Sequence, residues 1–228
     1  MTDYNPRDWA TGGQFTAGDA TEMSHQIDEE EQLNVTQQQR IAALEALTPA
    51  DWWPVEKLTG GFCFPHRMLS GASLVMVSGR IQLDIFRAPE TANRAQILKY
   101  AGTTPQSGTA PTVIKMGVYS VAANYDLTRI AVTANDTTLF ASTNASALKP
   151  FLAPCPFVRG QLYASALLIV TTGTIPSIWG PGNMGAGMTG SVEPRLSSQV
   201  LSQTDLPATI PNASVVSAAS IVTWSRFL

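Results

Sequence analysis

The spacing of apolar residues changes near residue 49, from helical in the first part of the chain to strand-like in the rest. Neither Gly nor Pro occurs between Gly18 and Pro49, so we predict a helix over residues 22 to 48. Written as heptads, this helix has a short apolar seam interrupted by polar residues, which weaken association but help to fix register and strand number. The seam positions include Ile27, Asn34, Gln37, Ile41 and Leu44.

The segment before the helix, residues 1 to 21, is rich in Gly, Thr and Asp. It holds too little apolar surface to fold alone. Trp9 and Phe15 are its isolated large apolar side chains, and we expect them to order only by docking onto another protein. A disordered tail is the alternative for this segment, and packing of the helix on its own domain is the alternative to a coiled coil.

Beyond residue 60, the apolar runs predict strands separated by Gly, Pro, Asn and Asp turns. Residues 80 to 85 alternate with a period of two, as a strand with one face in water should. The run LYASALLIV, residues 162 to 170, lacks this alternation and predicts a central strand buried on both faces. The expected strand-forming regions are 73–88, which holds two runs, 95–101, 111–121, 127–133, 137–142, 160–172 and 220–228. Residues 177 to 215 break the rhythm with an irregular, Gly-rich stretch.

About eight strands are the number expected of a jelly roll or a related sandwich. We therefore predict a mostly β protein, with a jelly-roll-like β-sandwich head preceded by an extended N-terminal arm and a short helical, coiled-coil stalk. The expected segments are an anchoring arm at 1–21, a trimeric stalk at 22–48, a junction at 49–72 and the head at 73–228.

Charge divides the chain into the same two parts. Residues 1 to 60 hold three Lys and Arg against eleven Asp and Glu, whereas the remainder holds eleven against six. No basic stripe with interleaved aromatics is present, so we expect no nucleic-acid partner. The N-terminus has no apolar run after a basic region, and the longest apolar stretch is too short to span a bilayer. We expect a soluble product made in the cytoplasm, with no membrane insertion.

The sequence carries no catalytic motif. His25 and His66 have no Cys, Asp or Glu at zinc-ligand spacing, and neither a nucleophile elbow nor a P-loop occurs. We expect neither a metal nor a cofactor, and we expect Cys63 and Cys155 to be free, partly buried thiols. A polysaccharide depolymerase would need two carboxylates from the six acids after residue 60, which are Asp84, Glu90, Asp126, Asp136, Glu193 and Asp205.

The remaining candidates are binding groups. Trp179 and Met184 lie in the Gly-rich stretch, where their apolar surface would be exposed on a monomer. They are candidates either for burial around a trimer axis or for a tip that contacts a receptor. Tyr125, Asn135 and Asp136 are candidates for glycan contact, because aromatic rings beside Asn and Asp can stack on sugars and satisfy hydroxyls.

Four phrases of the sequence carry a resemblance to a known class of proteins. They are DWATGGQFTAGDATEMSHQIDE, KMGVYSVAANYDLTRIAVTANDTTLFAS, VRGQLYASALLIV and PRLSSQVLSQTDLPATI. The last three resemble the C-terminal head of virion fibre and minor tail proteins of phages that infect actinobacteria. The first resembles the entry segment of phage fibre proteins, with Met23 and Ile27 at its apolar positions and Thr21-Glu22 where a Leu-Asn pair is usual.

This resemblance implies a non-enzymatic, homotrimeric virion appendage that is assembled in the host cytoplasm. Its N-terminus would be anchored to other tail or capsid proteins through residues 1 to 27, with Trp9, Phe15, Met23 and Ile27 as contacts. Its head would contact the host surface, where envelope glycans are the expected ligands. A capsid decoration fibre without a specific receptor is the alternative within the virion, and a polysaccharide depolymerase is the alternative outside that class.

Overall fold

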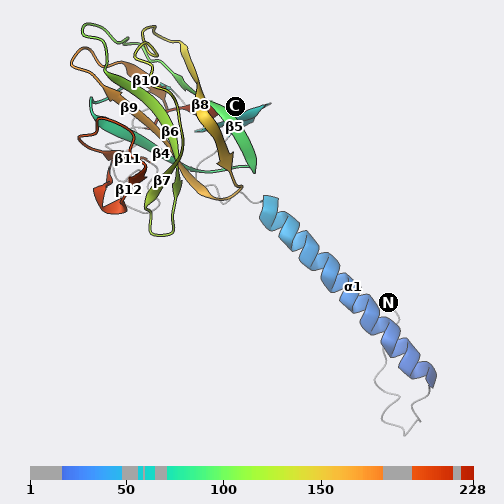
Figure 1. Cartoon of the computed structure of the whole chain (residues 1–228). Helices are drawn as coiled ribbons and strands as arrows, with labels where there is room; N and C mark the ends of the chain where they lie inside the picture. The colour runs from blue at the N-terminus through green and yellow to red at the C-terminus, as the bar shows by residue number, and fades with distance from the viewer. Residues whose placement is uncertain (1–16, 48–55, 59, 65–70, 182–196, 218–221) are drawn as a thin grey trace. The chain divides into compact units, whose positions relative to one another are not determined.

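The computed structural model describes residues 17–47, 56–58, 60–64, 71–181, 197–217 and 222–228 (Figure 1). The chain divides into two compact units, Met1–Pro49 and Ala50–Leu228, and each is described by itself. Within the described ranges, no helix combines the length and the apolar character needed to cross a bilayer. Trp9, Phe15 and Met184 lie outside the described residues.

The first unit contains helix α1, Ala17–Leu47, which begins five residues before the predicted residue 22. Its sequence is rich in Glu, Gln, Ala and Leu, which favour helices. Between residues 21 and 40 every side chain is exposed except that of Gln26, which is half-buried. Four large apolar side chains are among the exposed ones: Met23, Ile27, Leu33 and Val35. The described part of α1 therefore has no face buried within its own unit.

The second unit is built of antiparallel strands in three sheets. The five-stranded sheet has the order β1 (Glu56–Leu58), β2 (Gly61–Phe64), β14 (Ser225–Phe227), β5 (Ala92–Tyr100) and β8 (Ser146–Phe157). The seven-stranded sheet has the order β12 (Thr209–Ile210), β7 (Leu127–Val132), β6 (Val113–Val121), β9 (Leu162–Val170), β4 (Arg80–Arg87), β11 (Ser197–Val200) and β13 (Val216–Ser217). The two-stranded sheet pairs β10 (Ser177–Gly180) with β3 (Ala72–Val75), and a short 3-10 helix spans Asn212–Ser214.

The two large sheets enclose the main hydrophobic core. Phenylalanines of β2 and β14 meet Phe86 of β4 there, with ring centroids 5.2 Å apart for Phe227 and 5.3 Å for Phe64. A second core lies on the other face of the seven-stranded sheet, where Leu206, Ile210 and Val215 pack among its side chains. The unit is thus mostly β, with curled antiparallel sheets packed as in a β sandwich.

The second core explains why two strands of the seven-stranded sheet, β9 and β4, are buried on both faces. β9 is buried on both faces, which confirms the prediction for LYASALLIV. The prediction of one wet face for residues 80 to 85 was wrong, because Gln82 and Asp84 of β4 are only 1% and 0% exposed. Ile81, Leu83 and Ile85 fill the second core, so Gln82 and Asp84 point into the sandwich instead of into water.

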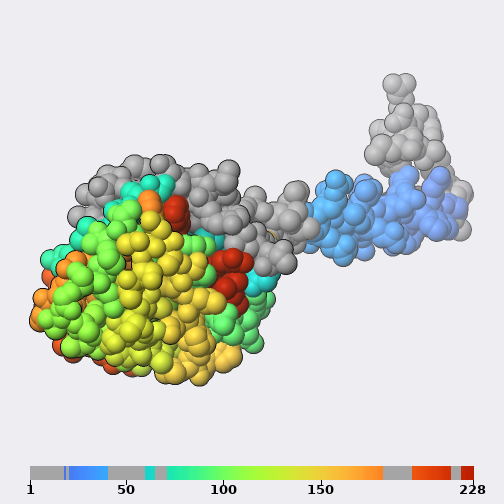
Figure 2. All heavy atoms as spheres, turned by 90° about the horizontal axis from the view of Figure 1, so that it is seen from above, coloured from blue at the N-terminus to red at the C-terminus, as the bar shows by residue number. Residues whose placement is uncertain are grey.

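The structure also differs from the sequence prediction between residues 137 and 157. Residues 137 to 142 form turns rather than a strand, because Asp136 accepts hydrogen bonds from the backbone and hydroxyl of Thr138. The long strand β8 follows, although its three prolines argue against a strand. β8 ends the sheet order, pairing with β5 on one side and forming an isolated bridge from Phe151 to Thr133. Its yellow-to-gold residues form part of the surface in Figure 2.

Candidate functional site

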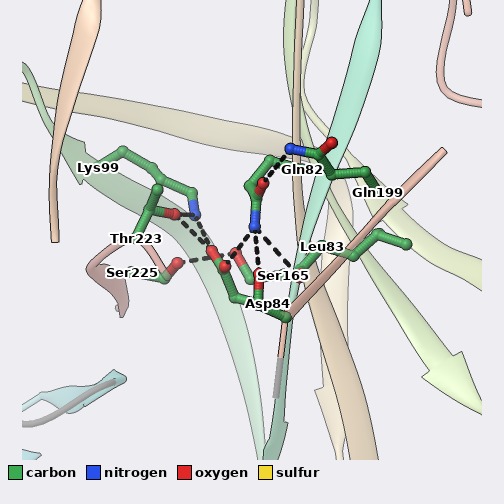
Figure 3. A network of polar contacts seen from close by, with 9 residues as sticks. Gln82, Leu83, Asp84, Lys99, Ser165, Gln199, Thr223 and Ser225 are labelled. Carbon is green, nitrogen blue, oxygen red and sulfur yellow. Dashed lines mark hydrogen bonds and ion pairs between the residues drawn. The ribbon is translucent and has the colours of Figure 1, made fainter. Parts of the chain in front are cut away.

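Two rows of polar residues lie in register on strands of the two large sheets. In the seven-stranded sheet, Asp84 of β4 is flanked by Ser197 of β11 and Ser165 of β9. In the five-stranded sheet, Lys99 of β5 is paired with Ser225 of β14. All five residues are fully buried. Figure 3 shows the Lys99 and Asp84 side chains pointing toward each other, so the rows meet inside the sandwich.

The centre of this arrangement is a buried ion pair bridged by a hydroxyl group. Lys99 Nζ lies 3.2 Å from Asp84 Oδ2 and donates a hydrogen bond of 2.6 Å to Thr223 Oγ1. The Thr223 hydroxyl in turn donates to Asp84 Oδ2. Lys99, Asp84 and Thr223 therefore form a closed triangle of polar contacts, and each is 0% exposed.

Further polar side chains complete a polar network around this triangle. Gln82 Nε2 donates to Asp84 Oδ1 at 3.0 Å and to Ser197 Oγ at 2.8 Å. Ser165 Oγ and Ser225 Oγ share a hydrogen bond of 2.8 Å that also joins the two sheets. Buried polar groups are costly unless they are paired. The partners shown here satisfy that requirement for both carboxylate oxygens of Asp84.

Burial dominates the electrostatics of the lysine. It lowers the pKa of Lys99 below its ordinary value, because desolvation penalises the ammonium, and the charge and hydrogen bond of Asp84 oppose this shift. Removing one partner of such a pair leaves an uncompensated group in a medium of low dielectric constant. The network therefore fixes which strands face each other, and it holds an amine against a carboxyl group away from water.

Two of the predicted anchoring residues, Met23 and Ile27, and the four predicted stalk residues lie on α1. Met23 and Ile27 are 41% and 55% exposed, and Asn34 and Gln37 are exposed as well. The side chains of Ile41 and Leu44 lie outside the described residues, although both positions are helical.

Trp179, a predicted tip residue, lies in β10 and is half-buried. Its indole Nε1 donates to Asn144 Oδ1 at 3.0 Å, and its ring stacks on Trp224 with centroids 6.5 Å apart. Trp224 meets Tyr100 edge-on at 6.4 Å. Sequence reasoning did not connect Trp224 or Tyr100 with Trp179, because the three residues are far apart in the sequence and approach one another only in the fold.

The predicted glycan contacts do not form one site. Tyr125 precedes β7 and Asn135 and Asp136 follow it, so they lie at opposite ends of that strand. Asn135 accepts a hydrogen bond from the Ile114 backbone and donates to the Thr112 carbonyl, while Asp136 pairs with a lysine. The polar atoms of Asn135 and Asp136 therefore hold loops in place.

An apolar surface on β8 escaped the sequence reasoning. The outer face of β8 is defined by six alternate residues that are all exposed, of which Leu152 is the most exposed at 71%. The sequence does carry a signal for this face, which is an apolar residue at every even position from 148 to 158. The prolines among these residues obscured the signal, because prolines argue against a strand. The members of this face are Leu148, Pro150, Leu152, Pro154, Pro156 and Val158.

The described carboxylates of the β unit are dispersed and engaged within the chain. Asp84, Glu90, Asp136 and Asp205 each pair with a Lys or Arg, and Asp126 accepts hydrogen bonds from Asn124 and the Asn212 backbone. Glu193 lies outside the described residues. Cys63 and Cys155 lie outside any disulfide, as predicted, but both are fully rather than partly buried, and burial raises the pKa of Cys155 to about 12.

The described part of the chain holds no cluster of three or more His, Cys, Asp and Glu side chains that could bind a metal ion. Comparison with known proteins adds no assignment: no family model matches the sequence, and no curated protein is significantly similar to it.

Proposed function

We propose that this protein is a non-enzymatic structural protein of a phage virion, a homotrimeric fibre with an N-terminal attachment segment and a jelly-roll-like head. The observation that carries the proposal is the exposure of helix α1. A helix of 31 residues presents four large apolar side chains to solvent over its described length. Helices in water gain most of their stability from packing, so α1 calls for partners outside its own chain.

The heptad positions of α1 indicate which face of the helix contacts these partners. Ile27, Asn34 and Gln37 fall on one seam, and polar residues on such a seam set register and oligomeric state. Identical helices associating in parallel would bury Ile27 and Met23 and place the attachment segments together at one end. The proposal accordingly builds the stalk from three copies of α1.

Two features of the β unit support a head that assembles rather than catalyses. The outer face of β8 exposes six apolar side chains, and exposed apolar patches mark contacts with other proteins. The described carboxylates are dispersed and paired, unlike the facing carboxylates of glycoside hydrolases. The resemblance of four phrases of the sequence to phage fibre and minor tail proteins supports the same proposal.

The oligomeric state is the first test. We expect light scattering on the full chain at micromolar concentration to give a mass of about three chains of 24.3 kDa. A monomer at that concentration would overturn the proposal, since the exposed helix would then have no partner.

Location on the particle is the second test. Gold-labelled antibody against the β unit should mark virions, at the tail if the protein is a minor tail fibre and over the capsid if it is a decoration fibre. A variant lacking residues 1 to 21 should still form trimers but fail to join particles. Incorporation of that variant at normal copy number would assign attachment to another segment.

Contact with the host is the third element of the proposal. Trp179, Trp224 and Tyr100 are half-buried aromatics that retain partial exposure, and aromatic side chains can stack on sugar rings. Binding of the full chain to host envelope glycans, lost in Trp179→Ala, would support a receptor-binding fibre. Full binding by that variant would exclude this aromatic group as the contact.

A further inference from the structure

The triangle formed by Lys99, Asp84 and Thr223 holds the two reactants of an amide bond in contact. Lys99 Nζ and Asp84 Oδ2 are 3.2 Å apart, both side chains are 0% exposed, and they belong to strands of different sheets. Well-oriented groups held in this way react as though at very high concentration. We propose that Lys99 and Asp84 condense into an isopeptide bond that ties β5 to β4 through the interior of the sandwich.

Reaction requires a neutral amine, and the site favours it. Desolvation lowers the pKa of Lys99, as it does for lysines that act as nucleophiles in apolar pockets. A buried ion pair is relieved of its desolvation cost when the proton moves from the ammonium to the carboxylate. The pair then becomes an amine facing a carboxylic acid, which are the species that condense.

Thr223 provides the path for that proton. Its Oγ1 accepts from Lys99 Nζ at 2.6 Å and donates to Asp84 Oδ2. A proton entering the hydroxyl from the lysine therefore displaces one toward the carboxylate oxygen. The same hydroxyl can protonate Oδ2 again as it leaves, which makes Thr223 the acid and base of the reaction.

Gln82 provides the stabilisation of developing charge. Its Nε2 donates at 3.0 Å to Asp84 Oδ1, the oxygen that Thr223 does not contact. When the amine attacks Cγ, negative charge develops on Oδ1, and a preorganised donor at that atom lowers the barrier. The contact of Gln82 Nε2 with Ser197 Oγ holds the amide in this orientation.

The step balances without a further reactant. The bond between Lys99 Nζ and Asp84 Cγ forms, and the bond between Cγ and Oδ2 breaks. Two protons of the ammonium pass to Oδ2, which leaves as water, and no atom changes its oxidation state. The product is a neutral amide, which removes both buried charges and joins two strands covalently.

Intact mass spectrometry of the denatured full chain tests the proposal. We expect the wild-type chain to be lighter than its sequence by one water molecule. Digestion with trypsin should yield a branched peptide that joins residues 81 to 87 to residues 95 to 115, because modified Lys99 is no longer cleaved. This peptide distinguishes the amide from a succinimide within a single segment, which has the same mass loss. A folded wild-type chain that keeps its full mass after prolonged incubation would overturn the proposal.

Two variants separate the bond from a persistent ion pair. Lys99→Arg keeps the positive charge but lacks the amine, so it should show the full sequence mass. Lys115→Arg is the matched control, because Lys115 contacts Asp205 at 2.7 Å on the surface, where the pair is exposed to water. It should lose one water as the wild type does. If Lys99→Arg fails to fold, the branched peptide of the wild type still decides the question.

The role of Thr223 is tested separately, by measuring how fast the chain loses the mass of one water molecule after refolding. Thr223→Val should slow the loss about 100-fold or more, since proton transfer by a positioned group contributes that much. Thr223→Ser restores the hydroxyl and should recover most of the rate. Equal rates of mass loss in the valine and serine variants would show that the Thr223 hydroxyl takes no part in the mechanism. The mass of the wild-type chain would still decide whether the bond forms.

Discussion

Helix α1 and the β sandwich place large apolar side chains in opposite surroundings. Phe62, Phe64 and Phe227 of the sandwich are 0% exposed, whereas Ile27 and Leu33 of α1 are 55% and 58% exposed. The sandwich obtains its stabilisation from side chains of its own chain, since burial of apolar surface drives folding. The described part of α1 obtains little of that kind within its own unit, and in the proposed fibre other copies of the helix supply it.

This difference predicts which substitutions change the stability of the sandwich and which change association. Substitutions inside the sandwich should change its free energy of unfolding, and substitutions on α1 should change association instead.

Phe86→Ala should have the largest effect. The ring is 3% exposed and lies 5.3 Å from Phe64 and 5.2 Å from Phe227, so its loss opens a cavity between the sheets. We expect a loss of about 3–5 kcal/mol in urea denaturation followed by near-UV circular dichroism. Leu152→Ala, at 71% exposure on β8, is the control, with a change below about 0.5 kcal/mol. A large loss in the control would show that the outer face of β8 is buried in the assembly.

Tyr119→Phe should have a smaller effect. Its hydroxyl donates to the Pro207 carbonyl at 2.8 Å, which ties the segment after β11 to the second core, and burial raises the pKa of Tyr119. Loss of one such hydrogen bond costs about 1 kcal/mol. Tyr125→Phe serves as the comparison, because the described part of the chain shows no hydrogen bond from that hydroxyl. Equal losses in both variants would contradict a specific role for the contact with Pro207.

Acid should weaken the sandwich modestly through Asp136. The hydrogen bond from Lys149 and those from Thr138 lower the pKa of Asp136 from 3.8 to about 2. A carboxylate with a depressed pKa stabilises the folded state above its unfolded pKa, and this stabilisation is lost as the pH falls from about 4 to 2. Denaturation curves at pH 5, 3 and 2 should show a shallower acid loss in Asp136→Asn than in the wild type. Identical pH dependence would assign the loss to other carboxylates.

The fold could be predicted from sequence where one physical signal dominated. The run of β9 has no polar alternation, so its burial on both faces followed directly. β8 was missed because three prolines remove backbone donors, which argues against a strand in a sheet interior. A strand that pairs along its length with β5 alone tolerates them. The turns at 137 to 142 were taken for a strand because Thr-rich apolar runs favour strands, and the local hydrogen bonds of Asp136 outweighed that preference.

The polar network could not be predicted in the same way. Polar and apolar residues alternate along β4 in the same way whether its polar face contacts water or a second row of polar residues. Lys99 is the single charge in the mostly apolar run 95 to 101, and nothing local pairs it with Asp84 rather than with solvent. Only the sheet registers, which place Ser225 beside Lys99 and Ser165 beside Asp84, bring the partners into one layer. Long-range pairing of this kind leaves no periodic trace in one sequence.

The last prediction concerns α1, where we expect no change in the unfolding of the sandwich at all. Ile27→Ser removes an apolar side chain from the heptad seam, and Leu33→Ser removes one of similar exposure that lies off the seam. Both variants should unfold with wild-type near-UV transitions. Ile27→Ser should lower the mass measured by light scattering as the protein is diluted, because apolar seam positions hold the strands of a coiled coil together.

The contrast between Ile27→Ser and Leu33→Ser decides which face of α1 associates. Dissociation by Ile27→Ser alone places the partner on the predicted seam. Dissociation by Leu33→Ser alone would move the contact to another face of the helix and displace Asn34 and Gln37 from the interface. If neither variant dissociates while the wild type is a trimer, the sandwich holds the oligomer together. The exposed face of β8 then becomes the surface to change, beginning with Leu152→Asp.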